Sequence, residues 1–200
     1  MASRSNIAGV SLNLPDDWFD VDLDAPDSSA WIADLGLELT EIADSAALFR
    51  ALDSLRSTFI EDAVDVAALY LPQPNDGVIA AAMVLDVFGL GVDDSPESYL
   101  QFAESHRTLR SAELDISAFQ SWRSSHANGE LVGYSYLALV TPDPESESTL
   151  EERAVFAIFP PGAAQMAQIT FRTARLGVFT DIAAETGAIV DALTFDLEPA

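Results

Sequence analysis

The stretch LDISAFQSWR (residues 114–123), followed by ANGE (127–130) and LVGYSYLALV (131–140), decides the fold class. The dipeptide Asn128-Gly129 is among the better short-range signals of a β-hairpin, because both residue types accept the backbone angles of a tight turn. We therefore expect two antiparallel strands on either side of this turn.

A second hairpin is expected downstream, with strands at residues 154–159 and 166–173 around Pro160-Pro161-Gly162. In its second strand, side chains of one kind occupy every other position, as in a strand with one face against a core. The apolar set is Ala167, Ile169 and Phe171, and the polar set is Gln168, Thr170 and Arg172.

Upstream, residues 64–71 and 78–90 predict two strands joined by a turn at 72–77. The second is apolar on both faces, which indicates a central strand covered on each side. Short strands are expected at residues 7–14, 18–23 and 194–197. In the strand at 18–23, Val21 and Leu23 share one face, while Asp20, Asp22 and Asp24 line the opposite face.

Helices are expected in three regions, each with apolar residues at helical spacing. The first region, in one or two pieces, ends with a helix from Asp44 or Ser45 to about Asp62, with a stripe at Leu48, Phe49, Leu52, Leu55, Phe59 and Ile60. The second begins at Ser95-Pro96-Glu97, a strong helix start, with a stripe at Tyr99, Phe102, Ala103, His106 and Leu109. The third covers residues 180–192, with a stripe at Ile182, Thr186, Ile189, Val190 and Leu193.

The order of these elements favours an α+β fold. Strands joined by tight turns make antiparallel pairs, and the helices come at the start, middle and end instead of alternating with strands. We expect an antiparallel β-sheet flanked by helices. No Gly/Ser-rich or Pro-rich linker divides the chain and no internal repeat is visible, so residues 1–200 are expected to form a single acidic α+β domain.

Charge excludes several kinds of partner. The 200 residues include 33 acids and 9 bases, all of them arginine, which gives a net charge of −24. Scattered arginines in such a field cannot form the cationic surface that nucleic acids need, and an anionic membrane is disfavoured for the same reason. The field favours a partner with a basic or mixed-charge surface, or it only keeps the chain soluble.

Missing residue types exclude further chemistry. The absence of cysteine removes disulfides, thiolate metal sites and cysteine nucleophiles, and the absence of lysine removes Schiff bases and the phosphate-binding P-loop. No long apolar run follows the N-terminal residues, and the longest apolar stretch, at 78–90, is interrupted by Asp86 and too short to span a bilayer. We therefore expect a cytoplasmic protein.

Two segments together carry a family resemblance. They are VSLNLPDDW (10–18) near the start, and QITFRT (168–173) leading into a helix and ALTF (192–195) near the end. This arrangement resembles the PsbP-like superfamily, an α/β/α sandwich shared by the photosystem protein PsbP, the Mog-type Ran-binding factors and the bacterial DcrB and LpqN proteins. The resemblance implies an accessory or binding role and carries over no functional residue. The chain lacks the lipobox cysteine and leader of the secreted bacterial members, which argues against an envelope role.

The strongest candidate for a binding segment is the acidic run at residues 142–152, which contains no base. It is either a solvated loop between strands or a docking loop for a cationic partner. Its acids, which we take as the candidate partner-binding residues, are Asp143, Glu145, Glu147, Glu151 and Glu152.

The other candidates have ordinary structural explanations. Asp20, Asp22 and Asp24 suggest a calcium loop, but Ala25 and Trp31 stand where that loop needs glycine and glutamate, so a solvated strand face is expected. His106 and His126 could serve a hydrolase or a two-histidine iron site with an acid, but no motif supports either role, and His106 is expected to be partly buried. Trp31, Trp122 and Phe49 either line a ligand cavity or belong to the core.

The sequence thus favours a non-enzymatic intracellular interaction module, an adaptor or assembly accessory protein, with neither cofactor nor metal. The alternatives are a small-molecule carrier and a hydrolase using a histidine and a carboxylate. A third interpretation is that the acidity is only an adaptation to high intracellular salt.

Overall fold

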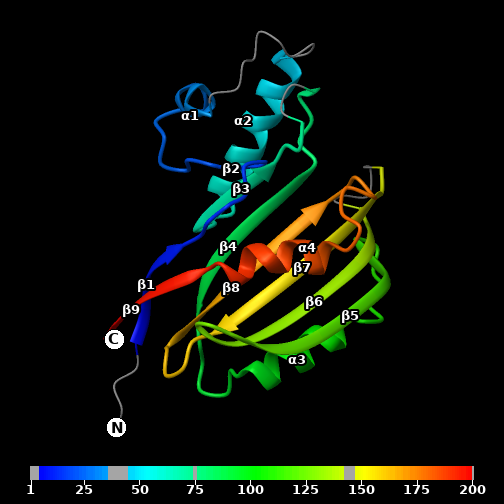
Figure 1. Cartoon of the computed structure of the whole chain (residues 1–200). Coiled ribbons are helices and arrows are strands. Elements are labelled where there is room, and N and C mark those ends of the chain that lie inside the picture. Colours follow the sequence, from blue (N-terminus) through cyan, green and yellow to red (C-terminus); the bar gives the residue numbers. More distant parts are fainter. Residues whose placement is uncertain (1–4, 36–44, 74–75, 142–146, 200) are drawn as a thin grey trace. The chain divides into compact units, whose positions relative to one another are not determined.

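The computed structural model describes residues 5–35, 45–73, 76–141 and 147–199 (Figure 1). The chain divides into two compact units, a larger one of residues 1–13 and 86–200 and a smaller one of residues 14–85. Whether they unfold as the single domain expected from the sequence stays a prediction. No helix among the described residues is both long and apolar enough to cross a membrane.

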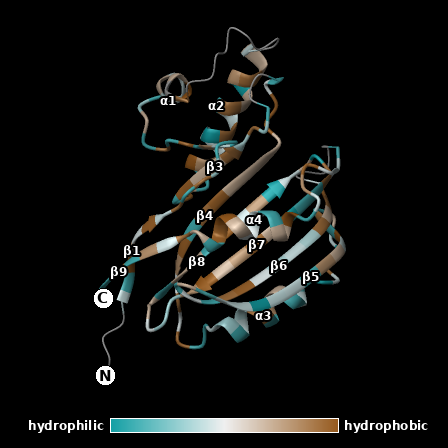
Figure 2. Ribbon diagram, in the orientation of Figure 1, coloured by the Kyte–Doolittle hydropathy of each residue, from teal (hydrophilic) through white to brown (hydrophobic). Residues whose placement is uncertain are grey.

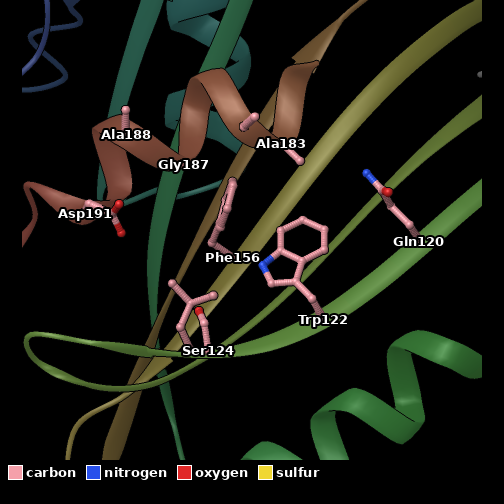
Figure 3. Close-up of a pocket in the computed structure, with 10 residues that line it drawn as sticks. Gln120, Trp122, Ser124, Phe156, Ala183, Gly187, Ala188 and Asp191 are labelled. Carbon is pink, nitrogen blue, oxygen red and sulfur yellow. The ribbon is translucent and has the colours of Figure 1, made fainter.

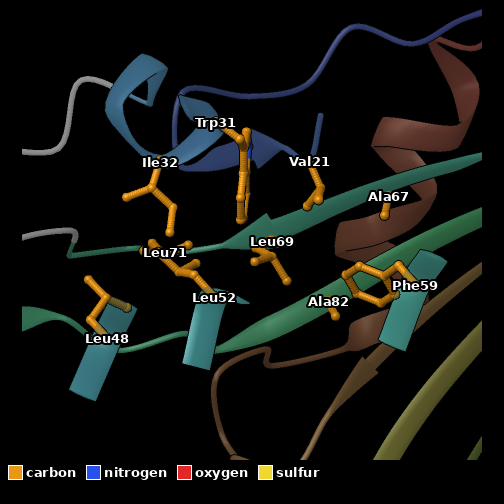
Figure 4. Packing of buried hydrophobic residues seen from close by; sticks show 10 residues of the cluster. All are labelled: Val21, Trp31, Ile32, Leu48, Leu52, Phe59, Ala67, Leu69, Leu71 and Ala82. Carbon is orange, nitrogen blue, oxygen red and sulfur yellow. The ribbon is translucent and has the colours of Figure 1, made fainter. Parts of the chain in front are cut away.

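The smaller unit packs two helices on short antiparallel strands. Strand β2 (Trp18–Asp20) pairs with β3 (Val66–Tyr70), which pairs with the first half of β4 (Ala81–Gly89). Helices α1 (Ser28–Asp34) and α2 (Ser45–Glu61) supply the rest of the core, shown in Figure 4. The helix predicted to begin at Asp44 or Ser45 is confirmed, and its stripe buries Leu48, Leu52 and Phe59 but leaves Ile60 46% exposed.

One buried arginine corrects the strand predicted at residues 18–23. The Arg56 guanidinium donates hydrogen bonds to the carbonyl oxygens of Asp22 (2.8 Å), Leu23 (3.1 Å) and Ala25 (2.6 Å). The Asp22 carboxylate accepts from the backbone N–H groups of Asp24 and Ala25. Since this segment is a turn held by Arg56, the strand ends at Asp20, and the predicted aspartate face is wrong.

The larger unit is built on four long antiparallel strands. Strands β5 (Leu114–His126), β6 (Gly129–Val140), β7 (Thr149–Phe159) and β8 (Gln165–Thr173) are each paired with the next. The hairpin predicted at Asn128-Gly129 joins β5 to β6. A two-stranded sheet of β1 (Ser5–Ser11) and β9 (Thr194–Pro199) brings the two ends of the described chain together.

Helices α3 (Pro96–Ser105) and α4 (Ile182–Asp191) contact opposite faces of β5–β8, as the alternation of side chains along β7 shows. The Tyr99 ring of α3 lies 5.7 Å from Phe159, whereas Phe156, three residues earlier on the strand, lies against Gly187 of α4. We call the face with Phe159 the α3 face and the face with Phe156 the α4 face. The result is the predicted α+β arrangement of antiparallel sheet and flanking helices.

The two helices begin as predicted. Ser95 caps α3 by accepting a hydrogen bond from the Ser98 backbone, with Pro96 next to it, and Asp181 caps α4. The α4 stripe is buried throughout, and Figure 2 shows both hydrophobic and hydrophilic residues along this helix. In α3 the predicted stripe is wrong at Phe102, which is 60% exposed.

Candidate functional site

A recess of about 450 Å³ lies between α4 and the α4 face of the sheet (Figure 3). We call it the α4 recess. The side chains of Trp122 on β5 and Phe156 on β7 point from the sheet toward the helix. The other residues used below to describe it are Gln120, Ser124, Gly187 and Asp191.

The recess exists because the two sides of α4 differ in size. One side carries the large residues Ile182, Ile189 and Val190, which are buried. The side that lines the recess carries only Ala183, Ala184, Gly187 and Ala188 before Asp191. These side chains are too short to fill the space above β5 and β6, so a hollow is left where larger residues would have extended the core.

A glycine in β6 makes room for the tryptophan of the recess. Gly133 lies directly opposite Trp122 in the β5–β6 register. A Cβ atom at position 133 would overlap the indole ring, so the ring occupies the space beside the Gly133 backbone that a side chain would otherwise fill. Phe156 completes the aromatic surface, with its ring centroid 5.8 Å from that of Trp122 in an edge-to-face arrangement.

The recess continues toward a second hollow of about 230 Å³, and both are lined by Gln120. The Gln120 amide donates from Nε2 to the hydroxyl of Ser135 at 2.8 Å. Glu152 lines the second hollow. The α4 face therefore offers an open, partly apolar surface with a carboxylate at each end, Asp191 at one and Glu152 at the other.

Acidic groups gather where α4 begins. Burial raises the pKa of the Glu152 carboxyl, and the nearby carboxylates of Asp181 and Glu185 raise it further. Asp181 and Glu185 also stabilise the start of α4, since Asp181 accepts a hydrogen bond from Ala184 N–H and Glu185 accepts one from Thr180 N–H. Their negative charges still remain on this face and disfavour a charge on Glu152.

The arginines of strands β5–β8 point to the other face. Arg123 pairs with Glu97 at 2.5 Å and with Glu130, and the Arg153 guanidinium lies over the Tyr136 ring. Arg172 is opposite Arg153 in the β7–β8 register and so shares its face. The α4 face of these strands therefore has no arginine of its own.

The tip of the β5–β6 hairpin holds the C-terminal end of α4. The Nε2 atom of His126 lies 3.0 Å from the carbonyl oxygen of Val190, while its Nδ1 accepts from the Asn128 N–H. The Asn128 amide donates to the carbonyl oxygen of Leu193 at 2.7 Å. These contacts add side-chain donors to carbonyl groups at and just after the end of α4, and they keep the helix over the recess.

The structure separates the acids predicted as a binding segment. Asp143 and Glu145 lie outside the described residues, and Glu147 is exposed before β7. Strand β7 begins at Thr149 instead of residue 154, so Glu151 and Glu152 belong to a strand and not to a loop. They point to opposite faces. Glu151 pairs with Arg153 at 2.7 Å, whereas Glu152 lies near the carboxylates of Asp181 and Glu185 at the start of α4.

The histidines and aromatic residues singled out in the sequence lie in different parts of the structure. His106 is partly buried, as expected, and its Nδ1 lies 2.8 Å from the Phe102 carbonyl oxygen, whereas His126 contacts α4 on the other side of the sheet. Neither imidazole is among the residues that line the two hollows. Trp31 and Phe49 belong to the core of the smaller unit, so only Trp122 of the three aromatic candidates lines the recess. Among the described residues no cluster of His, Asp and Glu could hold a metal ion.

Comparison with known proteins concerns the fold. LpqN, involved in cell envelope biogenesis of Mycobacterium tuberculosis, has 13% sequence identity and a TM-score of 0.49, with 98% of this chain and 86% of LpqN covered. The cyanobacterial PsbP of Synechocystis sp. PCC 6803 has 8% identity and a TM-score of 0.46, with 98% and 95% covered. LpqN and PsbP are both among the proteins that the resemblance seen in the sequence named. No protein-family model and no curated protein sequence matches the chain.

Proposed function

We propose that this chain is a non-enzymatic cytoplasmic interaction module, an adaptor or assembly accessory protein, that binds a basic or mixed-charge protein partner through its α4 face. The observation that carries the proposal is the gathering of Glu152, Asp181 and Glu185 on a face from which the arginines of β5–β8 point away. The net charge of −24 supports it.

The arrangement has a physical consequence for a partner. Carboxylates that repel one another raise the free energy of the unbound surface, and a cationic group placed among them lowers it. The field of the whole chain adds to this by speeding the approach of a positive surface, an effect that salt weakens. Binding should therefore be faster and tighter at low ionic strength.

A matched pair of variants tests the location. The α4-face variant carries Asp181→Asn, Glu152→Gln and Glu185→Gln, and the α3-face control carries Glu97→Gln, Glu104→Gln and Glu130→Gln. Both lose the same charge and keep the hydrogen-bonding shape of each side chain. Immobilised wild type and control should enrich the same protein from source lysate at low salt, and the α4-face variant should not.

Two results count against the proposal. Equal capture by both variants would place the partner elsewhere on the chain. Failure of the wild type to enrich any protein, at low or high salt, would end the idea of an interaction module.

The recess favours a second candidate function, that of a small-molecule carrier. A hollow of about 450 Å³ with Trp122 and Phe156 in its wall is in the size range of small-ligand sites. Native mass spectrometry of protein purified without denaturation should then show a bound compound that is absent from a Gly187→Leu variant. Detection of only the unliganded mass would exclude a tightly held cargo.

A further inference from the structure

We propose that the α4 recess receives the side chain of an arginine from a basic segment of the protein partner. The inference rests on the proposed function, and it names the chemical group that the face recognises. It follows from three features of the recess: its hydrogen-bond acceptors, an acid at a helix end, and an aromatic wall.

The polar groups of the recess are mainly acceptors. Gln120 uses its Nε2 on Ser135, which leaves its Oε1 oxygen as an acceptor. The Ser124 hydroxyl and the Asp191 carboxylate add further acceptor oxygens. Among the described residues that line the recess there is no basic side chain. A ligand rich in donors and positively charged complements this set.

Asp191 occupies an unfavourable place for an acid. It is the last residue of α4, where the partial negative charge of the helix end disfavours a carboxylate and favours a cation. No basic residue is present in the last turn of α4, and no ion pair of Asp191 occurs in the described part of the chain. A cation in the recess would relieve this repulsion directly.

The α3 face shows how this chain accommodates its own arginines. There Arg107 lies over the Phe119 ring, 5.2 Å from its centroid, and also contacts Glu104. Arg153 lies over the Tyr136 ring at 5.9 Å while it pairs with Glu151. Each of these guanidinium groups thus combines an aromatic face with a carboxylate.

The α4 recess also combines an aromatic face with a carboxylate, but no arginine lies between them. Trp122 and Phe156 supply the rings and Asp191 supplies the carboxylate. Among the aromatic side chains tryptophan attracts a cation most strongly. A planar guanidinium fits better than an ammonium, because it stacks on a ring while its edge donates several hydrogen bonds at once.

The test uses two tripeptides, acetyl-Gly-Arg-Gly-amide and its citrulline counterpart, which has nearly the same shape and no charge. The indole N–H signal of Trp122, assigned with Trp122→Phe, reports binding by NMR, and those of Trp18 and Trp31 in the other unit serve as internal controls. We expect the arginine peptide to shift the Trp122 signal to saturation at millimolar concentrations, and the citrulline peptide to bind at least about tenfold more weakly.

Variants then connect the shift to the recess. Asp191→Asn should weaken the arginine peptide by about tenfold, because a charged hydrogen bond is lost. Gly187→Leu should abolish the shift by filling the space under α4, while its Trp122 signal remains dispersed and shows that the unit is folded. Glu113→Gln, an equal loss of charge on an exposed residue outside the recess, should leave binding unchanged.

The outcomes separate this inference from the proposed function. Equal shifts from both peptides, or shifts of all three tryptophan signals, would refute the arginine site. If the peptide fails while partner capture still depends on Glu152, Asp181 and Glu185, the module stands and the arginine inference falls. If the peptide binds at Trp122 but no partner is captured at any salt, the recess recognises guanidinium and the interaction module is refuted.

Discussion

The two faces of the β5–β8 sheet both carry acids and aromatic rings, but these side chains are paired with arginines on one face only. On the α3 face, arginines, acids and aromatic rings pair with one another: Phe119, Tyr134 and Tyr136 form a stacked row, and the Tyr99 hydroxyl donates to Gln168 at 2.6 Å. On the α4 face the aromatic wall adjoins a hollow, and acids gather with no arginine from these strands.

The contrast teaches how a very acidic chain can concentrate its charge. Because side chains alternate along each strand, one face can receive every arginine of β5–β8 and neutralise its own acids there. The other face keeps an uncompensated negative charge beside an apolar surface. Charge on the α4 face is therefore a local property, and variants of single residues can test it.

Replacement of Gly133 by alanine should produce the largest effect. The new Cβ would overlap the Trp122 indole, which has the rigid backbone of β6 beneath it. We expect a loss of about 2–3 kcal/mol in the free energy of unfolding, as in other overpacked interiors. Urea denaturation of Gly133→Ala and of the double variant Gly133→Ala/Trp122→Ala measures this. A cost that persists in full after Trp122 is removed would show that the glycine is needed for another reason.

Loss of the hydrogen bonds from His126 and Asn128 to α4 and the residues after it, which we call the clasp, should have the second largest effect on stability. His126→Ala and Asn128→Ala each remove a side-chain bond to a carbonyl group at the end of α4, and each should cost about 1 kcal/mol. Hydrogen exchange should become faster in α4 and stay unchanged in α3.

The matched control for the clasp is His106→Ala on the other helix. The His106 imidazole contacts a carbonyl group of its own helix, so its loss releases no contact between helix and sheet. Equal acceleration of exchange in α4 by His106→Ala and His126→Ala would contradict the clasp.

Gly187→Ala should have a smaller effect, and a stabilising one. The new Cβ would lie 3.8 Å from the Phe156 ring, an ordinary contact distance, and alanine favours a helix over glycine by about 0.5–1 kcal/mol. Thermal unfolding should show a higher midpoint. A destabilised variant would mean that the α4 recess is already closed around this glycine.

Local signals in the sequence were sufficient to predict most elements. The Asn128-Gly129 hairpin and the cap at Ser95 are correct because they depend on neighbours in the chain. The α4 stripe is also correct, since helical periodicity alone identifies it. Whether the two units unfold together, as a single domain would, is a prediction for calorimetry.

The site was harder to predict because it depends on contacts between distant residues. Arg56 interrupts a predicted strand through carbonyl groups more than thirty residues away. The acids near Glu152 come from the start of α4, which follows one strand later, and only the alternation of side chains along β7 shows that Glu151 faces away from them. Two signals were visible in retrospect: a glycine in the middle of β6, and small residues repeated on one side of α4.

Neutralising Glu152 should have the smallest effect and the sharpest dependence on pH. Its pKa in the folded state is raised by burial and by Asp181 and Glu185, so folding favours the protonated form. The contribution of Glu152 to stability is therefore highest below the ordinary carboxylate pKa and falls as pH rises through the raised pKa.

Glu152→Gln removes this penalty and should stabilise the protein at pH 7 by about 0.5 kcal/mol or less, because solvent screens a partly exposed group. Chemical denaturation at pH 7 and in buffer below the ordinary carboxylate pKa measures the difference, which should vanish at the lower pH. Glu151→Gln, which loses an ion pair with Arg153 on the α3 face, should have the opposite sign at pH 7. The same sign for both substitutions would mean that the two faces do not differ in the way their charges are compensated.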